Sequence, residues 1–348
     1  MKNIVVRIVT NNLGGGARIH CYQLNKALEE NNIHTVTFIP KAPFPDTYSD
    51  REFVGMEYYH NLSFWKILHF CFKNRKRIRY IHTHLRKSDI IGLFISKILF
   101  IPHIITIHFP YQNKLIISCL HRVSILLSSK VIFISEFIKS FTTKQLKLVN
   151  NEKYKVIYNG SNQQKIINNM ENIESISFCV VGELTTRKGL LDLEELFLDE
   201  RFHSNLRKKV IINIYGEGHL VDFLYKLERL SNEKLELNVK GYEKDTSKIF
   251  LNNNFNLALS YGEAFGRTLT EAMSYGLKNI ARNDGAFREI VLSENEGYLF
   301  DDVDDLKRII ELLSEKSESV CRDAVLNSFN ARFTTQIFTK NTILFIEN

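Results

Sequence analysis

The stretch GEAFGRTLTEAMSYG, residues 262–276, follows the short apolar segment NLALS at 256–260 and leads into a helical pattern. A strand, a glycine-containing loop and a helix are therefore predicted in direct succession, which is the unit that builds parallel sheets. The helix is expected to begin near Gly266 or Arg267. Its core-facing stripe, at helical spacing, is Leu269, Ala272, Met273 and Gly276.

Two carboxylates, Glu263 and Glu271, stand eight positions apart in this stretch. An anion is favoured at the free N–H groups of the helix start, and Glu271, about one turn in, can accept hydrogen bonds from a ribose diol. Glu263, in the preceding loop, can reach hydroxyls beyond the phosphates. The alternative is a weak surface ion pair between Arg267 and Glu271. Residue chemistry alone leaves both interpretations open.

Short apolar runs alternate with helical patterns along the whole chain. Strands are predicted at 4–9, 34–39, 80–85, 103–109, 130–135, 155–159, 177–181, 210–215, 235–240, 256–260 and 279–282. Strands separated by helices predict α/β architecture, with two doubly wound parallel sheets whose carboxyl ends face an interdomain cleft. The predicted parts are an N-terminal domain over 1–160, a polar linker over 161–176, a C-terminal domain over 177–327 and a last helix, 328–348, crossing back onto the first domain.

The composition is that of an ordinary globular protein, with 44% hydrophobic and 24% charged residues in 348. The sequence shows neither a signal-peptide core nor an apolar run long enough to span a membrane, so we expect a cytoplasmic protein. Five scattered cysteines without a CxxC pair predict free thiols and no zinc site.

The net charge of +7 is uneven, because residues 73–88 are rich in Lys and Arg and follow the aromatic stretch SFWKILHFCFK. Residues 63–88 could form an amphipathic helix with a basic end that rests on an anionic membrane surface. The favoured interpretation is a core-packed helix followed by a solvated charge run. No nucleic-acid motif accompanies the charge, so nucleic-acid binding is disfavoured.

Two further loops could hold phosphate. Gly14 to Gly16 follow the first strand and precede a helix, although a plain tight turn explains them equally well. The next strand ends at Pro40 and Lys41, without the acidic residue that a ribose diol needs, so NAD is disfavoured. In the second half, Gly182 is followed by Arg187 and Lys188, which suit a diphosphate or form a solvated basic pair.

The spacing Glu263-x7-Glu271, written EAFGRTLTE and followed by AMSYG, resembles the E-x7-E motif of retaining glycosyltransferases with the two-domain GT-B fold. The resemblance is to glycosyltransferase family 4 (glycosyl transferases group 1) and covers nearly the whole chain. The supporting segments, in the family's order, are GGGARIHCYQLNKALEENNIHTVTF, TIHF, VIFISEFIKSF, KVIYNGSN, GELTTRKG, YGEGHL, VKGY, GAFREIV and EGYLF.

The resemblance implies a nucleotide-diphosphate sugar donor, with a UDP-sugar favoured, and a glycan, lipid-linked or protein acceptor. Glu271 would bind the ribose, Glu263 would contact the sugar, and Lys188 would neutralise the leaving diphosphate. His108 would lie near the reacting sugar, which gives Glu263, Lys188 and His108 as the implied catalytic set. The implied donor-binding set is Gly15, Gly16, Gly182, Arg187, Lys188, Gly216, Tyr242, Glu263, Ala264, Phe265, Gly266, Arg267 and Glu271.

The implied reaction is transfer with retention at the anomeric carbon, without a cofactor or metal, because positive charge and positioning do the work. His82 and His84 alternate on one predicted strand, so they share a face, and His108 is expected to lie nearby. A satisfied polar cluster is favoured over a metal site there, because no third ligand at metal spacing follows.

The sequence departs from the family pattern at two places. Glu183 stands where the family often has arginine, and Leu277-Lys278 stand where it tends to have proline. A carboxylate at position 183 would repel a diphosphate. Glu183 therefore leaves open a non-catalytic sugar-nucleotide-binding partner of a glycosyltransferase complex. A separate alternative is another GT-B activity, such as a nucleotide-sugar epimerase or a sugar phosphorylase.

Overall fold

The protein is described here by a computed structural model that places residues 3–10, 16–39, 57–59, 63–110, 115–164, 174–315 and 322–347. The chain divides into two compact units, Met1–Gly160 with Thr335–Asn348, and Ser161–Thr334. Each unit has its own sheet and its own hydrophobic core. None of the helices in the described part of the chain is long and apolar enough to cross a membrane.

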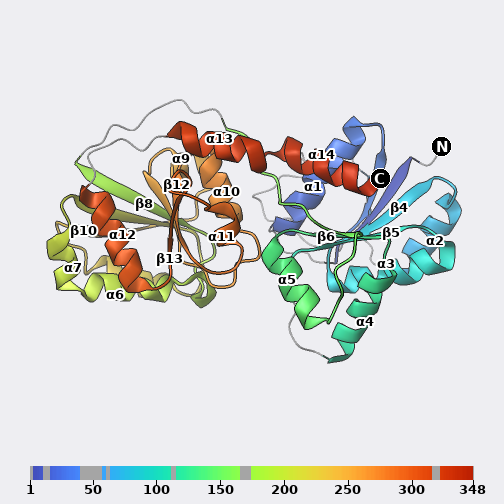
Figure 1. The fold of residues 1–348 in the computed structure, drawn as a ribbon, viewed down its shortest axis with the longest axis horizontal. Helices are drawn as coiled ribbons and strands as arrows, with labels where there is room; N and C mark the ends of the chain where they lie inside the picture. The colour runs from blue at the N-terminus through green and yellow to red at the C-terminus, as the bar shows by residue number, and fades with distance from the viewer. Residues whose placement is uncertain are drawn as a thin grey trace. The chain divides into compact units, whose positions relative to one another are not determined.

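The first unit is built on a seven-stranded sheet in the order β3-β2-β1-β4-β5-β6-β7, with every described pair parallel (Figure 1). Its strands are β1 (Ile4–Ile8), β2 (His34–Phe38), β3 (Glu57–Tyr59), β4 (Ile78–Thr83), β5 (His103–Ile107), β6 (Lys130–Phe133) and β7 (Tyr154–Val156). All five residues of β1 and of β5 are buried, as expected for parallel strands covered on both faces.

Two layers of helices cover this sheet. The helices of the unit are α1 (Gly16–Glu30), α2 (Phe64–Asn74), α3 (Arg86–Leu99), α4 (Leu115–Leu127), α5 (Glu136–Gln145) and α14 (Thr335–Glu347). One face of β1 packs with α2 and α3 through Ile67 and Ile95. The other face packs with α1 and α14 through Leu24 and Phe338, so the end of the chain completes the core of the first unit.

The second unit is built on a six-stranded parallel sheet in the order β10-β9-β8-β11-β12-β13. Its strands are β8 (Ser175–Val181), β9 (Lys209–Tyr215), β10 (Leu235–Gly241), β11 (Phe255–Ala258), β12 (Lys278–Arg282) and β13 (Gly297–Phe300). Its helices are α6 (Leu193–Leu198), α7 (Glu200–Asn205), α8 (Val221–Glu228), α9 (Thr246–Phe250), α10 (Arg267–Ser274), α11 (Phe287–Ile290), α12 (Val303–Glu315) and α13 (Arg322–Arg332), with 3-10 turns η2 (Thr186–Lys188) and η3 (Leu190–Asp192).

The predicted parallel α/β architecture is confirmed, with two additional strands. The additional strands are β3 and β13, of three and four residues, which were not predicted from the sequence. Residues 63–88 form no single helix: α2 ends at Asn74, and β4 begins four residues later at the centre of the sheet. α2 buries Ile67 and Cys71 against the core, as the favoured interpretation required.

Candidate functional site

The loop between β11 and α10 is held in one conformation by its neighbours. The Gly262 amide donates to Asp284 Oδ2 at 2.8 Å, and the Glu263 carbonyl accepts from the Ala286 amide at 2.9 Å. Gly266, the N-cap residue just before α10, has φ of 98°, and a Cβ there would lie 2.8 Å from the Phe287 ring. Only glycine meets both demands without strain, so Gly266 fixes the place where the helix starts.

The first turn of α10 has backbone N–H groups that could donate hydrogen bonds to an anion. No side chain caps the helix at Gly266, and the core stripe expected from the sequence is buried. Ala264 and Phe265, in the loop just before the helix, are also buried. Amides of an uncapped first turn, with the positive end of the helix dipole, attract an anion.

Two cations from the β8 loop meet the Glu263 carboxylate. Lys188 Nζ lies 3.0 Å and Arg187 Nη1 3.4 Å from Glu263 Oε2. Lys188 and Glu263 are each 19% exposed, whereas Arg187 is 57% exposed. Lys188 is therefore the cation held in place, and Arg187 is a solvated neighbour whose pairing is worth little.

The loop after β8 is packed tightly against the loop after β9. Gly216 has φ of 146°, and a Cβ there would lie 1.9 Å from the Gly182 carbonyl oxygen. The two sequence-predicted glycines therefore touch. A pocket forms beside them, lined among others by Gly182, Glu183, Lys188, Ser260 and Thr268. This pocket joins the Lys188 loop to the first turn of α10.

Glu271 and Arg267 form the ion pair that the sequence offered as an alternative, with 3.0 Å between Arg267 Nη2 and Glu271 Oε1. The Glu271 side chain remains 30% exposed. Arg267 Nη1, in contrast, is buried and has no hydrogen-bond partner among the described residues. A pair of this kind is weak, so it leaves Glu271 able to exchange its partner for a ligand hydroxyl.

Arg282 is a residue that sequence reasoning missed. It is 5% exposed at the end of β12, donates to the Leu259 carbonyl, and is ion-paired with Asp192. Its guanidinium lies 4.1 Å from the centre of the Tyr261 ring, and the Tyr261 hydroxyl also donates to Asp192. This network supports the backbone ahead of Glu263. No sequence motif predicts it, because its members come from three separate segments.

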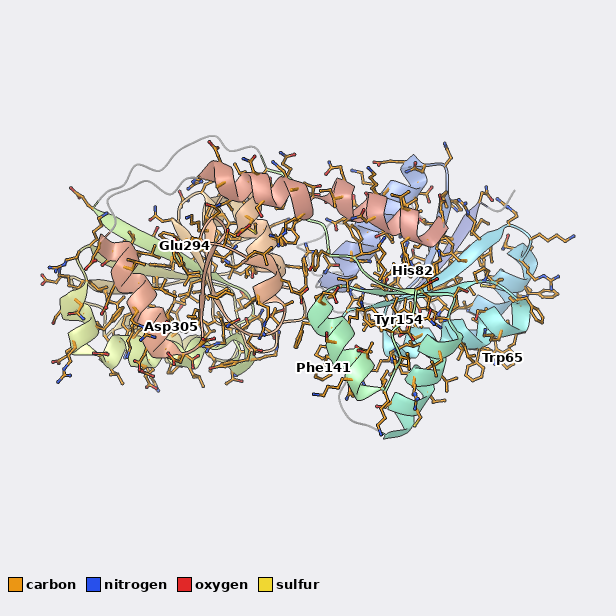
Figure 2. All side chains as sticks on the ribbon, in the orientation of Figure 1. Trp65, His82, Phe141, Tyr154, Glu294 and Asp305 are labelled. Atoms are coloured by element: carbon orange, nitrogen blue, oxygen red, sulfur yellow. The ribbon has the colours of Figure 1, made fainter. Side chains whose placement is uncertain are left out.

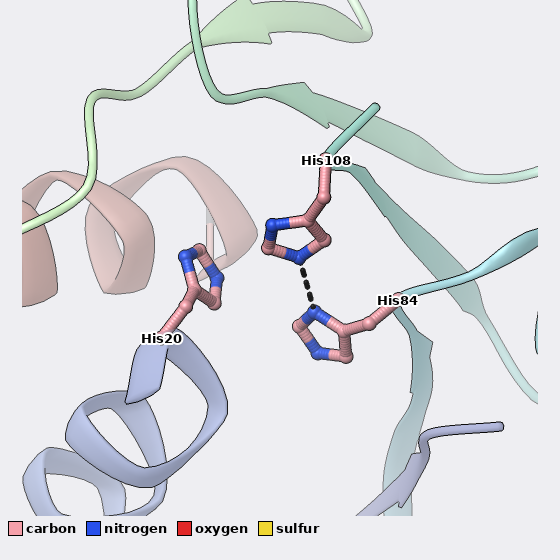
Figure 3. A group of neighbouring side chains, drawn as sticks. All are labelled: His20, His84 and His108. Atoms are coloured by element: carbon pink, nitrogen blue, oxygen red, sulfur yellow. Dashed lines mark hydrogen bonds between the residues drawn. The ribbon is translucent and has the colours of Figure 1, made fainter. Parts of the chain in front are cut away.

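The first unit contains a separate buried cluster at the carboxyl ends of β4 and β5 (Figure 3). His84 Nδ1 and His108 Nε2 lie 3.1 Å apart, and His20 of α1 packs against both rings. As expected for residues that share a face of one strand, the ring centres of His82 and His84 lie 4.3 Å apart. Burial holds the pKa of His82, His84 and His108 well below the ordinary value of 6.5.

His20, which sequence reasoning missed, adds the third member of a potential metal-ligating group. One ring nitrogen from each of His20, His84 and His108 lies within 4.8 Å of the others. The same residues also take part in a hydrogen-bond network, since His20 Nδ1 is 2.8 Å from Asn159 Oδ1 and His84 Nε2 is 2.7 Å from Arg7. The rings are hydrogen-bonded, but the cluster is not fully satisfied as the sequence analysis expected, because His108 Nδ1 is buried without a hydrogen-bond partner among the described residues.

The remaining site residues are placed only in part. Gly15 lies outside the described residues, and Gly16 is the first residue of α1. Tyr242, after β10, is 53% exposed. Glu183 is exposed beside the pocket and forms no ion pair with any described residue.

Comparison with known families assigns both halves of the chain. The family model described as Glycosyltransferase Family 4 matches residues 14–165, and the one described as Glycosyl transferases group 1 matches residues 161–325. The chain is a glycosyltransferase of this type. Among proteins of curated function, none matches the sequence.

Solved structures show that the glycosyltransferase has the GT-B fold. Anabaena Alr3699/HepE, solved in complex with UDP, has a TM-score of 0.79 at 16% identity over 99% of both chains. A glycosyltransferase from Rickettsia africae gives 0.80 at 15% identity over 99% of this chain and 98% of its own. The lipopolysaccharide outer core galactosyltransferase WaaB gives 0.76 at 16% identity, over 99% and 100%.

Proposed function

We propose that this glycosyltransferase transfers a hexose or N-acetylhexosamine from a UDP-sugar to a hydroxyl of a glycan or lipid-linked acceptor, with retention at the anomeric carbon. The observation that carries the proposal is the pocket shared by Lys188 and the open start of α10, with Glu263 ion-paired to Lys188. One structural relative, Anabaena Alr3699/HepE, was solved with UDP and separately with UDP-glucose, which supports uracil as the base of the donor.

Each charged group has a distinct role in this proposal. Lys188 and the first amides of α10 stabilise the negative charge that grows on the diphosphate as the sugar leaves. Glu263 positions the sugar through its hydroxyls, and Glu271 accepts hydrogen bonds from the ribose. Charge stabilisation by these groups supports transfer without a metal ion, and unchanged turnover in the presence of EDTA is the expected result.

A membrane-bound acceptor is supported by the outward side of α2. Trp65 is 74% and Phe72 65% exposed, and Figure 2 shows Trp65 directed away from the sheet. The exposed cations Lys66, Lys73, Arg75, Lys76 and Arg77 accompany them. Aromatic rings with adjacent cations suit an anionic surface, so we place the enzyme in the cytoplasm at the inner membrane face, where it contributes to surface polysaccharide or glycoconjugate synthesis.

The surface proposal is tested by flotation with anionic and neutral vesicles. Wild-type protein should float with anionic vesicles at low salt, and Trp65→Ser with Phe72→Ser should reduce the bound fraction. Lack of binding to anionic vesicles at low salt would remove the membrane from the proposal and leave the donor site untouched.

A second candidate, a non-catalytic sugar-nucleotide-binding partner, is favoured by one observation. Glu183 is an exposed carboxylate at the pocket that would hold a diphosphate. Glu183→Arg creating activity in an inactive wild type would support that candidate, and robust wild-type turnover would dismiss it. Product analysis distinguishes an epimerase or a phosphorylase from a glycosyltransferase; an epimerase, for example, forms its product without an acceptor.

A thermal-shift panel with UDP, GDP, ADP, CMP and NAD is the first test of the donor. A ligand at about 100 times its dissociation constant stabilises the folded state by roughly 2.7 kcal/mol, which a melting curve resolves. Stabilisation by UDP above the others supports the proposal. Stabilisation by none of the five would contradict it.

A further inference from the structure

Arg7 is a fully buried cation in the middle of the first sheet. It lies on β1, one strand away from the histidine cluster, and is 0% exposed. Its Nε donates to Asn25 Oδ1 at 2.6 Å. Its Nη1 lies 2.9 Å from His82 Nδ1 and 2.7 Å from His84 Nε2. Two imidazoles are therefore in contact with one guanidinium nitrogen.

This contact decides where the protons of the two imidazoles reside. A guanidinium has only donors, so His84 Nε2 and His82 Nδ1 must each accept. A neutral imidazole carries one N–H, which is then on Nδ1 of His84 and on Nε2 of His82. The second of these agrees with the surroundings, because His82 Nε2 lies 2.8 Å from the Thr106 hydroxyl.

The position of the proton on His84 determines the position of the proton on His108. His84 Nδ1 lies 3.1 Å from His108 Nε2, drawn as the dashed line in Figure 3. Since His84 Nδ1 carries the proton, it donates, and His108 Nε2 accepts. The single N–H of His108 is thus on Nδ1. All three rings are neutral near pH 7, because burial holds their pKa values well below 6.5.

The last nitrogen in this series of hydrogen bonds is His108 Nδ1. His108 Nδ1 is buried and has no hydrogen-bond partner among the described residues. Buried donors without an acceptor are rare in native structures, and each calls for an explanation such as a ligand. His108 follows β5 at the carboxyl end of the sheet, the edge at which open α/β sheets bind ligands.

We infer that Arg7 is a positioning residue that fixes His108 as a hydrogen-bond donor through its Nδ1–H, available to an acceptor oxygen of a sugar substrate at the carboxyl end of the first sheet. The occupant of this site rests on the proposed function; the tautomer does not. One consequence is that His108 cannot act as a general base through Nδ1, because that nitrogen has no free lone pair.

A metal ion is the rival occupant of the same cluster. Each histidine ligand must offer an unprotonated nitrogen. While His84 accepts from Arg7 at Nε2 and carries its proton on Nδ1, it has no lone pair to offer. A metal bound by His20, His84 and His108 would therefore require Arg7 to leave His84.

The tautomer is tested by nitrogen NMR of the full-length protein labelled at the histidine rings, without any ligand. The signals are assigned by difference from His84→Asn and His108→Asn. We expect His108 to show a protonated Nδ1 and an unprotonated Nε2. In Arg7→Met, a His108 population protonated at Nε2 should appear, whereas Arg7→Lys, which retains a donor, should keep the wild-type pattern.

Thr106→Val is the matched control. It removes the hydrogen bond on the His82 branch and leaves the path through His84 intact, so the His108 signals should not change. An unprotonated Nδ1 in wild-type His108 would overturn the inference even if Arg7→Met fails to fold. So would an unchanged pattern in folded Arg7→Met, or a one-to-one zinc complex whose ligands include His84.

A kinetic arm separates this inference from the proposed function. In a double-mutant cycle, Arg7→Met and His108→Asn should each lower kcat/KM by about tenfold, the size of one lost hydrogen bond, and the two losses should not add. Additive losses would overturn the positioning role. Lack of UDP binding would contradict the proposed function, while the NMR result would still decide the tautomer.

Discussion

Lys188 Nζ lies 3.0 Å from Glu263 Oε2, both side chains are 19% exposed, and Lys188 lines the pocket beside α10. The two residues are 75 positions apart in the sequence and come from the loops after β8 and β11, which are neighbouring strands. The pair places a cation and a carboxylate next to each other at one edge of the sheet. In the proposed complex the diphosphate would pair with Lys188, and the sugar hydroxyls would donate hydrogen bonds to Glu263.

Lys188→Ala should lower kcat by about 10²–10³-fold, the usual effect of removing one group that stabilises developing negative charge. The Glu263 carboxylate would remain near the pocket with only the solvated Arg187 beside it. Steady-state kinetics with the UDP-sugar provides the measurement. Arg187→Ala is the matched control, because its exposed pair is worth at most about 1 kcal/mol, and it should leave kcat within a few-fold of wild type. Equal losses in both variants would refute the distinct role of Lys188.

Glu271→Gln should weaken UDP binding by about 10–100-fold, since hydrogen bonds to a charged group are worth about 1.5–3 kcal/mol. The same change should scarcely alter the unfolding free energy, because the Arg267–Glu271 pair spans one turn of a helix on a partly exposed surface. UDP titration and urea unfolding, performed on the same protein, measure the two effects. A large loss of stability with unchanged UDP affinity would assign Glu271 a structural role.

The sequence indicated this site in part, and the limits have physical reasons. The local sequence pattern was sufficient to predict where α10 begins, because a glycine just before an apolar stripe at helical spacing is a short-range signal. The motif resemblance brought Lys188 and Glu263 into one site, and the structure shows that they touch. Arg282 and Asp192 escaped because their pairing depends on how β12 and the β8 loop meet, which no local pattern reports.

The same limit applies to the first unit. Alternation along β4 predicted that His82 and His84 share a face, but nothing local linked them to Arg7 or His20. Arg7 sits in a run of apolar residues that reads as an ordinary buried strand. Only the pairing of β1 with β4 brings its guanidinium to the histidines.

Gly266→Ala should destabilise the second unit more than Gly241→Ala does. Both glycines have positive φ, 98° and 71°, so both substitutions incur the backbone cost of about 1–2 kcal/mol. At Gly266 the new methyl would also meet the Phe287 ring at 2.8 Å, whereas at Gly241 it would meet no atom within 4 Å. Overpacking adds about 1–3 kcal/mol, which urea unfolding should resolve. Equal free energies of unfolding for the two variants would show that the Phe287 ring moves aside at little cost.

Stability should fall as the solution is acidified below about pH 6.5. Burial lowers the pKa of His103 to about 3 and holds those of His82, His84 and His108 well below 6.5. These residues are neutral when folded and take up protons on unfolding, so their contribution is complete above 6.5 and is lost as the pH falls toward the folded values. Each such histidine contributes a slope of about 1.4 kcal/mol per pH unit.

Urea unfolding across this acidic range measures the slope, and His103→Gln provides the comparison. The variant should lose one histidine's share of the slope, whatever its stability near pH 7. A free energy of unfolding that is flat from pH 7 to about pH 5 would show that the histidines are protonated in the folded protein.

The central claim is that the second unit, Ser161–Thr334, holds the diphosphate of a UDP-sugar between Lys188 and the start of α10. Calorimetric titration of the full-length protein with UDP, and separately with uridine, tests it most directly. We predict one UDP site per chain and binding of uridine at least about 100-fold weaker, since the diphosphate makes the charge-assisted contacts. No binding of UDP, or equal affinity for UDP and uridine, would contradict the claim.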